Sequence, residues 1–468
     1  MNARDALPDV LSLITADQFR LITSDPDTAV LIQGIAGSGK TTVALHRLTW
    51  LLHEENSPLA PNQCLVLVFT KALRSYVTQT LAHLGAGAVP VLTFRSWVDK
   101  ILPSLLNVKT VIRPEEAQTG GVSRVKRSLA MLLALEEAQL TGLIDQSAPY
   151  TEAILDVLSR PERLLKHDET GLLDRALIQE ACVQTKSLFA RGLIDYADDA
   201  LIIRLHQLRT GAMAMPDGSQ GLFEHIVVDE AQEFNSPEIA AVIGALRQPS
   251  HLTLVGDTAQ QIRQDALFPG WARIRERFAN TDGQTRLTTL SVSHRSSLPI
   301  MRLADFIYGE KRTSEGKKGK PPIWFKCLTE NEGIRQILAW LERVIRRYPN
   351  SVIAVVCPNT AEARYALSLL KPTFGAAARL GDEDSFSFGA GILVSSVEQI
   401  KGLEFPNVLI WNPSSKAYPA NDTARNMLYV AVTRAEDRLC LVTWGKPSTL
   451  LPHITSSLVR GHQPDSPE

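Results

Sequence analysis

The stretch Ala29-Val-Leu-Ile-Gln-Gly-Ile-Ala-Gly-Ser-Gly-Lys-Thr-Thr42 decides the fold, because it joins three local structures in a fixed order. Its apolar beginning is typical of a buried parallel strand, and its glycines predict a tight loop. From Thr41 onward, apolar side chains recur at helical spacing. A strand, a G-x-x-x-x-G-K-T loop and a helix together predict a phosphate-binding loop. A plain glycine turn at a strand end would not require the lysine, the threonine and both flanks.

The residues of this loop are those that a nucleoside triphosphate needs. Backbone N–H groups beside the glycines point at phosphate oxygens, and the following helix adds its positive N-terminal end. Lys40 would reach the β- and γ-phosphates, and the hydroxyl of Thr41 would hold Mg²⁺. We therefore expect ATP and Mg²⁺ as ligands. The predicted loop contacts are Gly34, Ala36, Gly37, Ser38, Gly39, Lys40, Thr41 and Thr42.

Length and composition describe an ordinary globular chain. The 468 residues predict roughly two to four domains. The net charge of −1 means that any nucleic-acid contact must come from local patches. The five cysteines are scattered without metal spacing, so we expect no disulfide and no zinc site, and a cytoplasmic location. The sequence shows neither a signal-peptide pattern nor an apolar run long enough to cross a bilayer, which predicts no membrane association.

The periodicity predicts two parallel α/β sheets. Strand patterns of the first sheet flank a long region of helical periodicity, and strands alternate with helices again after a polar, basic stretch at 308–322. That stretch is either a solvated loop or a contact to a nucleic-acid backbone. The predicted divisions are a first lobe at 1–100 and 216–300, a helical insertion at 101–215, a second lobe at 301–453 and a flexible tail at 454–468.

Two adjacent carboxylates follow the apolar strand that ends in Ile226-Val-Val-Asp229. Phosphoryl transfer to water needs a metal ligand and a group that orients the water, so Asp229 suits the metal and Glu230 suits the water. In isolation such a pair is often only a strand end that meets solvent. A second polar strand end, Gly256-Asp-Thr-Ala-Gln260, makes Gln260 a candidate link between a γ-phosphate and the neighbouring surface.

Six segments carry a resemblance to a known family. They occur in order and are Gly34–Thr41, Asp229-Glu-Ala-Gln232, Gly256-Asp-Thr-Ala-Gln260, His294-Arg-Ser296, Lys401-Gly-Leu-Glu-Phe405 and Tyr429-Val-Ala-Val-Thr-Arg-Ala435. Together they resemble the motif set of UvrD/Rep-class superfamily-one DNA helicases, and the wording of the first segment is especially similar to the HelD-type branch. The resemblance implies a P-loop NTPase of the α/β class. It would have two RecA-like parallel-sheet lobes, with ATP between them and a helical insertion in the first lobe.

The resemblance also implies an activity and further site residues. The activity would be ATP-dependent movement along single-stranded DNA, more than RNA, in the 3′ to 5′ direction. Gln260 would couple the nucleotide state to lobe closure, and Arg295 and Arg434 would reach the γ-phosphate from the second lobe. Glu404 would touch the nucleotide or the strand-binding surface. Gln18 would read the adenine edge, although Thr15-Ala-Asp-Gln18 also fits a helix capping box.

For the nucleic-acid groove the resemblance implies Thr70, Lys71, Thr93, Phe94 and Trp97. These residues supply hydroxyls and a cation for phosphates, and aromatic faces for bases. Phe94 and Trp97 could equally be core residues. The short acidic-aromatic segment at 195–198 also resembles a family segment, but no role follows for it.

Three departures from the family pattern bear on activity. The family's base-stacking tryptophan is missing after Gln260, where Phe268 or Trp271 could substitute. His294 replaces a tyrosine that packs on adenine, and Glu398 replaces a histidine. About a hundred residues separate Arg295 from Lys401, and the second sheet needs nearly all of them. The sequence therefore predicts a compact form that lacks the large accessory domain of the second lobe.

Two other functions stay open. The chain could be an ATPase subunit that remodels a partner complex. HelD-type relatives release stalled RNA polymerase, and compact UvrD-like chains accompany nucleases in antiviral defence systems such as Gabija. It could also bind ATP only as a switch, although the full set of charged residues argues against this.

Overall fold

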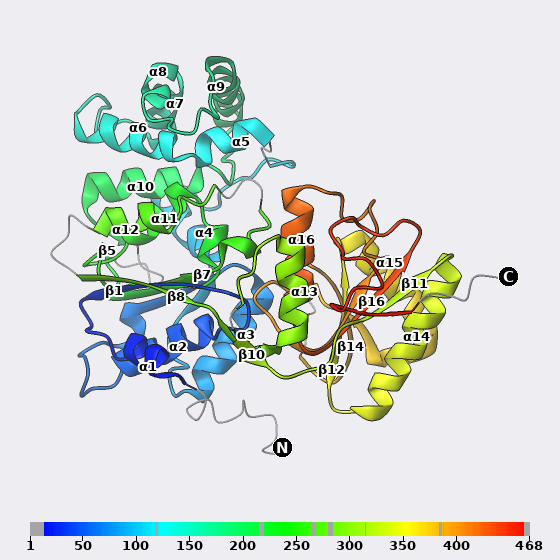
Figure 1. Cartoon of the computed structure of the whole chain (residues 1–468). Helices are drawn as coiled ribbons and strands as arrows, with labels where there is room; N and C mark the ends of the chain where they lie inside the picture. The colour runs from blue at the N-terminus through cyan, green and yellow to red at the C-terminus, as the bar shows by residue number, and fades with distance from the viewer. Residues whose placement is uncertain are drawn as a thin grey trace.

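The computed structural model describes residues 14–117, 120–214, 220–263, 267–278, 284–313, 315–382, 386 and 388–462. The chain forms two α/β lobes side by side, with a layer of helices above the first lobe (Figure 1). None of the helices in these ranges has the length and hydropathy to cross a membrane.

The first lobe is built on a six-stranded sheet in which every pair of neighbours is parallel. Side chains alternate across it: Val30 and Ile32 join one apolar cluster, and Ala29 and Leu31 join the other. The strands, in spatial order, are β3 (Val91–Thr93), β2 (Cys64–Val68), β6 (His225–Val228), β7 (Leu252–Gly256), β1 (Thr28–Gly34) and β8 (Gln284–Leu290).

Helices cover both faces of this sheet. One face packs against α1 (Ala16–Ile22), α2 (Lys40–Leu51) and α3 (Lys71–His83). The other face packs against α4 (Phe94–Leu105), α11 (Ser236–Ile243) and α12 (Trp271–Phe278). The phosphate loop therefore leaves the end of a strand that is buried on both sides.

The helical insertion forms a separate layer beyond α4 and α11 (Figure 1). Its elements are α5 (Gly120–Arg127), α6 (Leu129–Leu140), α7 (Tyr150–Leu158), α8 (Pro161–Leu165), α9 (Arg175–Ala190), α10 (Asp199–Thr210) and the antiparallel strands β4 (Met213–Ala214) and β5 (Gln220–Gly221). A fully buried ion pair, Lys126 Nζ to Asp198 Oδ1 at 2.6 Å, joins α5 to the start of α10. The acidic segment at 195–198 thus contributes a packing contact. Because α4 begins at Phe94, one helix crosses the predicted boundary at 100/101.

The second lobe is built on a seven-stranded parallel sheet, so the predicted fold class is confirmed. The strands, in spatial order, are β13 (Ala378–Leu380), β14 (Gly391–Ser396), β12 (Val352–Cys357), β15 (Phe405–Trp411), β16 (Ala435–Trp444), β11 (Ile323–Cys327) and β17 (Arg460–His462). Its helices are α13 (Leu298–Tyr308), α14 (Glu330–Arg347), α15 (Thr360–Phe374) and α16 (Asp422–Thr433).

Two local differences from the sequence-based prediction follow from long-range strand pairing. Within the predicted tail at 454–468, β17 pairs with β11 and extends the sheet, and residues 463–468 lie outside the described part. Within the basic stretch at 308–322, β10 (Glu315–Lys317) pairs with β9 (Val292–Ser297). Part of that stretch is therefore ordered against the first lobe's end and is not a free loop.

The two lobes share one apolar cluster, which contains Val30 of β1 and Val356 of β12. Helices α13 and α16 lie side by side between the sheets (Figure 1). Between Arg295 and Lys401, the described residues form the end of β9, strand β10, strands β11 to β14 of the second sheet and helices α13 to α15, with no added domain among them. This agrees with the predicted compact second lobe.

Candidate functional site

The phosphate loop connects β1 to α2 and needs glycine at two positions. Gly37 and Gly39 have φ values of 69° and 82°, a region that side-chain-bearing residues rarely adopt. A Cβ on Gly37 would also lie 2.6 Å from Ser293 Oγ, which comes from β9. Gly37 is therefore required for two reasons: its backbone conformation and the close approach of β9.

The loop offers polar groups that suit a bound phosphate. The Lys40 ammonium donates to the carbonyl oxygens of Gly34 and Ile35, both at 2.9 Å, and in the described part of the chain it forms no ion pair. The buried Ser38 hydroxyl has no hydrogen-bond partner, and Ala36 is buried beside it. A lysine ammonium without an ion pair among the described residues and an orphaned hydroxyl, in a loop whose glycines adopt the left-handed conformation, fit a triphosphate.

Thr41 and Asp229 meet although 188 residues separate them. The Thr41 hydroxyl donates to Asp229 Oδ2 at 2.8 Å, which joins the start of α2 to the end of β6. Burial, followed by the neighbouring Glu230 carboxylate, raises the pKa of Asp229 to about 7. A hydroxyl and a carboxylate are oxygen donors that Mg²⁺ prefers, so this pair fits the predicted metal.

Glu230 stands in a strained conformation next to this pair. Its φ of 56° lies in the left-handed region, which costs free energy for any residue with a side chain. Gln232 Nε2 donates to Glu230 Oε2 at 2.5 Å and fixes the direction of the carboxylate. Strain of this kind concentrates at functional positions and supports the role predicted for Glu230.

Gln18 forms the capping box and also contacts the phosphate loop, while its predicted adenine contact stays a prediction. It completes the capping box, because its Oε1 accepts from Thr15 N–H at 3.0 Å and its own N–H donates to the Thr15 hydroxyl. Its Nε2 donates to the Ser38 carbonyl oxygen at 3.0 Å, so the same amide also touches the phosphate loop. The capping role therefore does not exclude a nucleotide contact.

A cavity of about 590 Å³ lies between the lobes at this loop. Of the predicted site residues, those that line it are Gln18, Gly37, Gly39, Thr42, Arg295 and Glu404, whereas Lys40, Thr41, Asp229, Glu230, Gln260 and Arg434 do not. The cavity also includes Tyr76 of α3 and Phe388, whose rings lie 6.1 Å apart and which the sequence reading missed. His294, exposed at the cavity, donates its backbone N–H to the Gly37 carbonyl oxygen. The lining residues are Ile14, Gln18, Ile22, Gly37, Gly39, Thr42, Val43, Tyr76, His294, Arg295, Lys317, Phe388, Gly402, Leu403, Glu404 and Glu436.

Arg295 bridges the phosphate-loop helix and the second lobe. One guanidinium nitrogen donates to Thr42 Oγ1 and another to Glu404 Oε2, both at 2.8 Å. Burial opposes ionisation of Glu404, but the Arg295 and Arg434 guanidiniums outweigh it and hold the pKa of Glu404 below its ordinary value. Arg295 therefore lies beside the phosphate loop, and its contact to a γ-phosphate stays a prediction.

Arg434 reaches the first lobe from the end of α16. Its Nη2 donates to Gln260 Oε1 at 2.6 Å, and its Nη1 donates to the Leu403 carbonyl oxygen at 3.1 Å. Gln260 in turn donates its Nε2 to Asp257 Oδ2 at 2.9 Å. The residue predicted to couple the lobes is thus in direct contact with a second-lobe arginine.

Lys401 is a site residue that the sequence reading missed. Its fully buried ammonium lies against the Glu233 carboxylate, 2.6 Å from the Gln260 carbonyl oxygen and 3.5 Å from Glu230 Oε2. The segment Lys401-Gly-Leu-Glu-Phe405 was recognised, but only Glu404 was assigned. The signal that could have indicated Lys401 was its place in the same segment as Glu404.

The predicted nucleic-acid residues are placed less favourably. The hydroxyls of Thr70 and Thr93 cap α3 and α4, accepting from Leu73 N–H and Ser96 N–H at 3.1 Å each. Lys71 is the first residue of α3. These positions lie where strands β2 and β3 end, but the two threonine hydroxyls already serve the helix ends.

The two aromatic residues of this set pack inward. Trp97 is 0% exposed in the cluster under the helical insertion, so no base can stack on it, and its predicted nucleic-acid role is wrong. Phe94 is half-buried, with ring contacts to Trp97 and Phe234 at 5.7 and 5.8 Å. The spacing of Trp97, Val98, Ile101 and Leu102 was a helical core signal. Trp97 is a core residue and not a nucleic-acid contact, because it lies on the face of α4 that is buried.

We expect Trp97→Ala to lower the free energy of unfolding by about 3–5 kcal/mol, because it opens a cavity in a closed core. Urea unfolding followed by circular dichroism measures the loss. Trp97→Phe is the control: it should lose less stability and bind a labelled single-stranded oligonucleotide like the original protein. A tenfold weaker oligonucleotide affinity of Trp97→Phe at unchanged stability would restore the nucleic-acid role.

The proposed aromatic substitutes after Gln260 differ in exposure. Trp271 is 7% exposed and belongs to the core, whereas Phe268 is half-buried with its ring 5.4 Å from that of Trp271. Of the two, only Phe268 keeps a face for a base. Glu398, which replaces the family histidine, is exposed.

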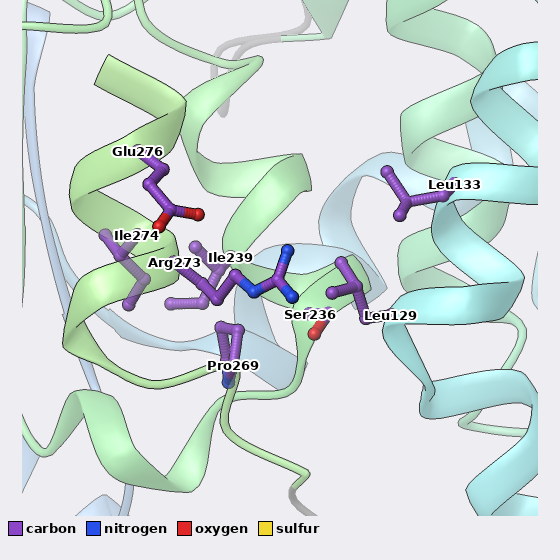
Figure 2. Close-up of a pocket in the computed structure, with 8 residues that line it drawn as sticks. All are labelled: Leu129, Leu133, Ser236, Ile239, Pro269, Arg273, Ile274 and Glu276. Atoms are coloured by element: carbon purple, nitrogen blue, oxygen red, sulfur yellow. The ribbon is translucent and has the colours of Figure 1, made fainter. Parts of the chain in front are cut away.

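A second cavity, of about 360 Å³, lies away from the phosphate loop, between α6, α11 and α12 (Figure 2). Leu129 and Leu133 face Ile239 and Ile274 across it, and the Arg273 guanidinium points into it. It contains none of the predicted site residues.

Comparison with known proteins gives two family matches that follow one another along the chain. Residues 14–264 match the model described as the UvrD/REP helicase N-terminal domain. Residues 391–442 match the model described as the UvrD-like helicase C-terminal domain. The first match alone spans more than half of the chain.

Several characterised proteins are similar at low identity. DNA helicase II of Salmonella typhimurium is 25% identical over 343 residues, which is 69% of this chain and 45% of that protein. ATP-dependent DNA helicase PcrA of Bacillus subtilis is 26% identical over 50% of this chain and 32% of its own length. A probable DNA helicase of Mycoplasma pneumoniae is 21% identical over 92% and 83%. The chain therefore spans less than half the length of the first two relatives.

Proposed function

The chain belongs to the UvrD/REP helicase family, and we propose that it hydrolyses ATP between its two lobes and uses the cycle to move along single-stranded DNA. The observation that carries the proposal is the position of two arginines on the second-lobe side: Arg434 caps the end of α16, and Arg295 lies in β9, which packs against β16 and α13 of that lobe. Arg295 touches Thr42 directly after the phosphate loop, and Arg434 touches Gln260. Arg295 and Glu404 line the cavity opposite Thr42, so a nucleotide there would be contacted from both lobes.

The roles follow from the contacts. Lys40 and the loop N–H groups bind the β- and γ-phosphates, and Glu230 orients and deprotonates the attacking water. Thr41 and Asp229 would hold Mg²⁺, whose charge would offset that of the phosphates. Arg295 and Arg434 stabilise the negative charge that develops during transfer. Gln18 and Glu404 border the remainder of the nucleotide.

Movement follows if the two lobes grip the strand differently before and after hydrolysis. Gln260 links the two lobes through Arg434, so loss of the γ-phosphate would change a contact that both lobes share. The relatives are named as DNA helicases, which favours DNA over RNA. The 3′ to 5′ direction and the HelD-type likeness stay predictions from motif wording.

The test is ATPase activity with single-stranded DNA, single-stranded RNA, duplex DNA and no polymer. We expect the largest stimulation with single-stranded DNA. Direction is measured by displacement of streptavidin from biotinylated oligonucleotides, which a 3′ to 5′ motor achieves only at the 5′ end. The absence of turnover with every polymer would refute the proposal, and displacement only at the 3′ end would reverse the direction.

A second candidate is a motor subunit that remodels a partner complex, such as a transcribing polymerase or a nuclease assembly in antiviral defence. The compact second lobe favours it, because the described residues between Arg295 and Lys401 contain no added domain to engage a duplex. Co-purification of a stoichiometric protein would support this candidate. Efficient duplex unwinding by the isolated chain would count against it.

A further inference from the structure

One arginine of the basic stretch at 308–322, Arg312, forms an ion pair with the first lobe. Arg312 follows α13, and its side chain is only 14% exposed. Its Nη2 donates to Asp257 Oδ1 at 2.6 Å, and its Nη1 lies 3.4 Å from Asp257 Oδ2. Because Asp257 directly follows β7, this ion pair joins the two lobes beside Gln260. Such a two-pronged contact fixes the carboxylate plane more firmly than a single bond would.

The second lobe holds Arg312 on its other side. The guanidinium donates to the Tyr429 hydroxyl at 2.9 Å and lies over the Tyr308 ring, 5.0 Å from its centre. Tyr308 ends α13 and Tyr429 belongs to α16, and these two helices pack together. Arg312 therefore moves with the second lobe, although its ion pair is with Asp257 of the first lobe.

Asp257 is the point from which two branches lead to the nucleotide site. Its carboxylate accepts from Gln260 Nε2 at 2.9 Å, and Gln260 accepts from Arg434. Its backbone N–H donates to Gln232 Oε1 at 2.9 Å, and Gln232 donates to Glu230. A shift of Asp257 would consequently disturb both the lobe-coupling amide and the carboxylate that faces the water.

We propose that Arg312 is a positioning residue that transmits the placement of the second lobe to Gln260 and Glu230 through Asp257. The proposal rests on the ATP hydrolysis proposed above and adds a cross-lobe contact to that same site. Arg312 touches neither nucleotide nor water in this scheme. Its contribution is to hold fully buried Asp257 in one orientation.

The charge balance of Asp257 supports this arrangement. Burial alone would raise the pKa of Asp257, but the Arg312 guanidinium and the Lys40 ammonium outweigh burial and hold that pKa below its ordinary value. The carboxylate can then accept from Gln260 without sharing its oxygens with a proton. Without Arg312, a buried charge would lose its cation, and Asp257 would be free to turn toward Lys40.

The experiment compares Arg312→Met with Arg302→Met, a control that removes an exposed arginine from neighbouring α13. We expect Arg312→Met to lower kcat for ATP by about a hundredfold, the cost of misplacing reacting groups by about 1 Å, with KM changed less than about twofold. Arg302→Met should match the original protein. Arg312→Lys keeps the charge but not the fork, so it should recover part of the loss.

A double variant separates positioning from simple charge neutralisation. If Arg312 acts through Asp257, Arg312→Met combined with Asp257→Asn should have a kcat about equal to that of the worse single variant. If Arg312 only compensates a buried charge, the double variant should regain full kcat, which would overturn the proposal. Multiplied losses would overturn it too, because they mean that the two residues act independently.

Hydrogen exchange without nucleotide gives a readout that does not depend on turnover. Arg312→Met should exchange faster at the Ala259 amide, which donates to Asp257 Oδ1, and the amides of β12 should be unchanged. Equal exchange at residues 257–261 in both proteins would overturn the proposal. An inactive original protein would instead refute the proposed hydrolysis, so the two failures are distinguishable.

Discussion

Replacing Glu230 with glutamine is expected to lower kcat for ATP hydrolysis by about 10³-fold while nucleotide affinity is kept. Glutamine has the same shape, so it can still occupy the left-handed position and accept from Gln232. It cannot take a proton from water, and it removes the charge that faces Lys401 at 3.5 Å. Single-turnover phosphate release measures the chemical step, and a fluorescent ATP analogue measures binding.

The matched control for this substitution is Glu342→Gln, which changes an exposed glutamate on α14 away from the cavity. It should hydrolyse ATP at the original rate. Turnover of Glu230→Gln above a tenth of the original rate would remove Glu230 from the chemistry. Weaker analogue binding at normal turnover would assign it to ground-state binding instead.

The parts of the site that could be predicted are those in which chemistry dictates local sequence. A phosphate loop must combine a strand end, glycines in unusual backbone conformations, a lysine and a helix start within about ten residues, so Gly37, Gly39 and Lys40 are recognisable without a structure. Asp229 is recognisable because a short apolar strand directly precedes it and a second acidic residue, Glu230, follows it. Each of these signals is contained in one segment of chain.

Contacts between distant segments could not be predicted in the same way. Lys401 and Glu233 are 168 residues apart, and Arg312 stands in a polar stretch whose composition resembles a solvated loop. Whether such a cation is buried depends on which carboxylate the folded lobes bring to it. Sequence shows the charge but not the partner.

Recognition also misled where one residue could satisfy two patterns. Trp97 fitted both a groove motif and the apolar face of α4, and the helix decided the outcome because it buries that face completely. For Gln18 the structure shows the cap together with a bond to the loop, because one amide has enough donors and acceptors for both, and the predicted adenine contact stays a prediction. When one residue fits two sequence patterns, its burial and its number of hydrogen-bonding groups in the folded chain decide which roles it can fill.

Removing either second-lobe arginine is expected to lower kcat by about 10³-fold or more, because each supplies positive charge to the transferring phosphoryl group. Arg295 is the cleaner probe. Its side chain is 32% exposed, and it bonds to two side chains, Thr42 and Glu404, so Arg295→Ala should leave the fold intact. Stopped-flow phosphate release with saturating ATP and single-stranded DNA measures the effect.

Arg434 needs a milder substitution, because it also supports the backbone of the second lobe. It donates to the carbonyl oxygens of Val430 and Leu403, and although the Thr433 hydroxyl also donates to Val430, an alanine would remove the Arg434 donor from the Leu403 carbonyl oxygen. Arg434→Lys keeps the charge but cannot reach Leu403 and Gln260 together, so kcat should fall while the unfolding temperature changes little. Arg425→Ala, which removes a partly exposed arginine of α16, is the control. Full activity of both Arg295→Ala and Arg434→Lys would show that the second lobe does not contribute to hydrolysis, and the cavity would then serve for nucleotide binding alone.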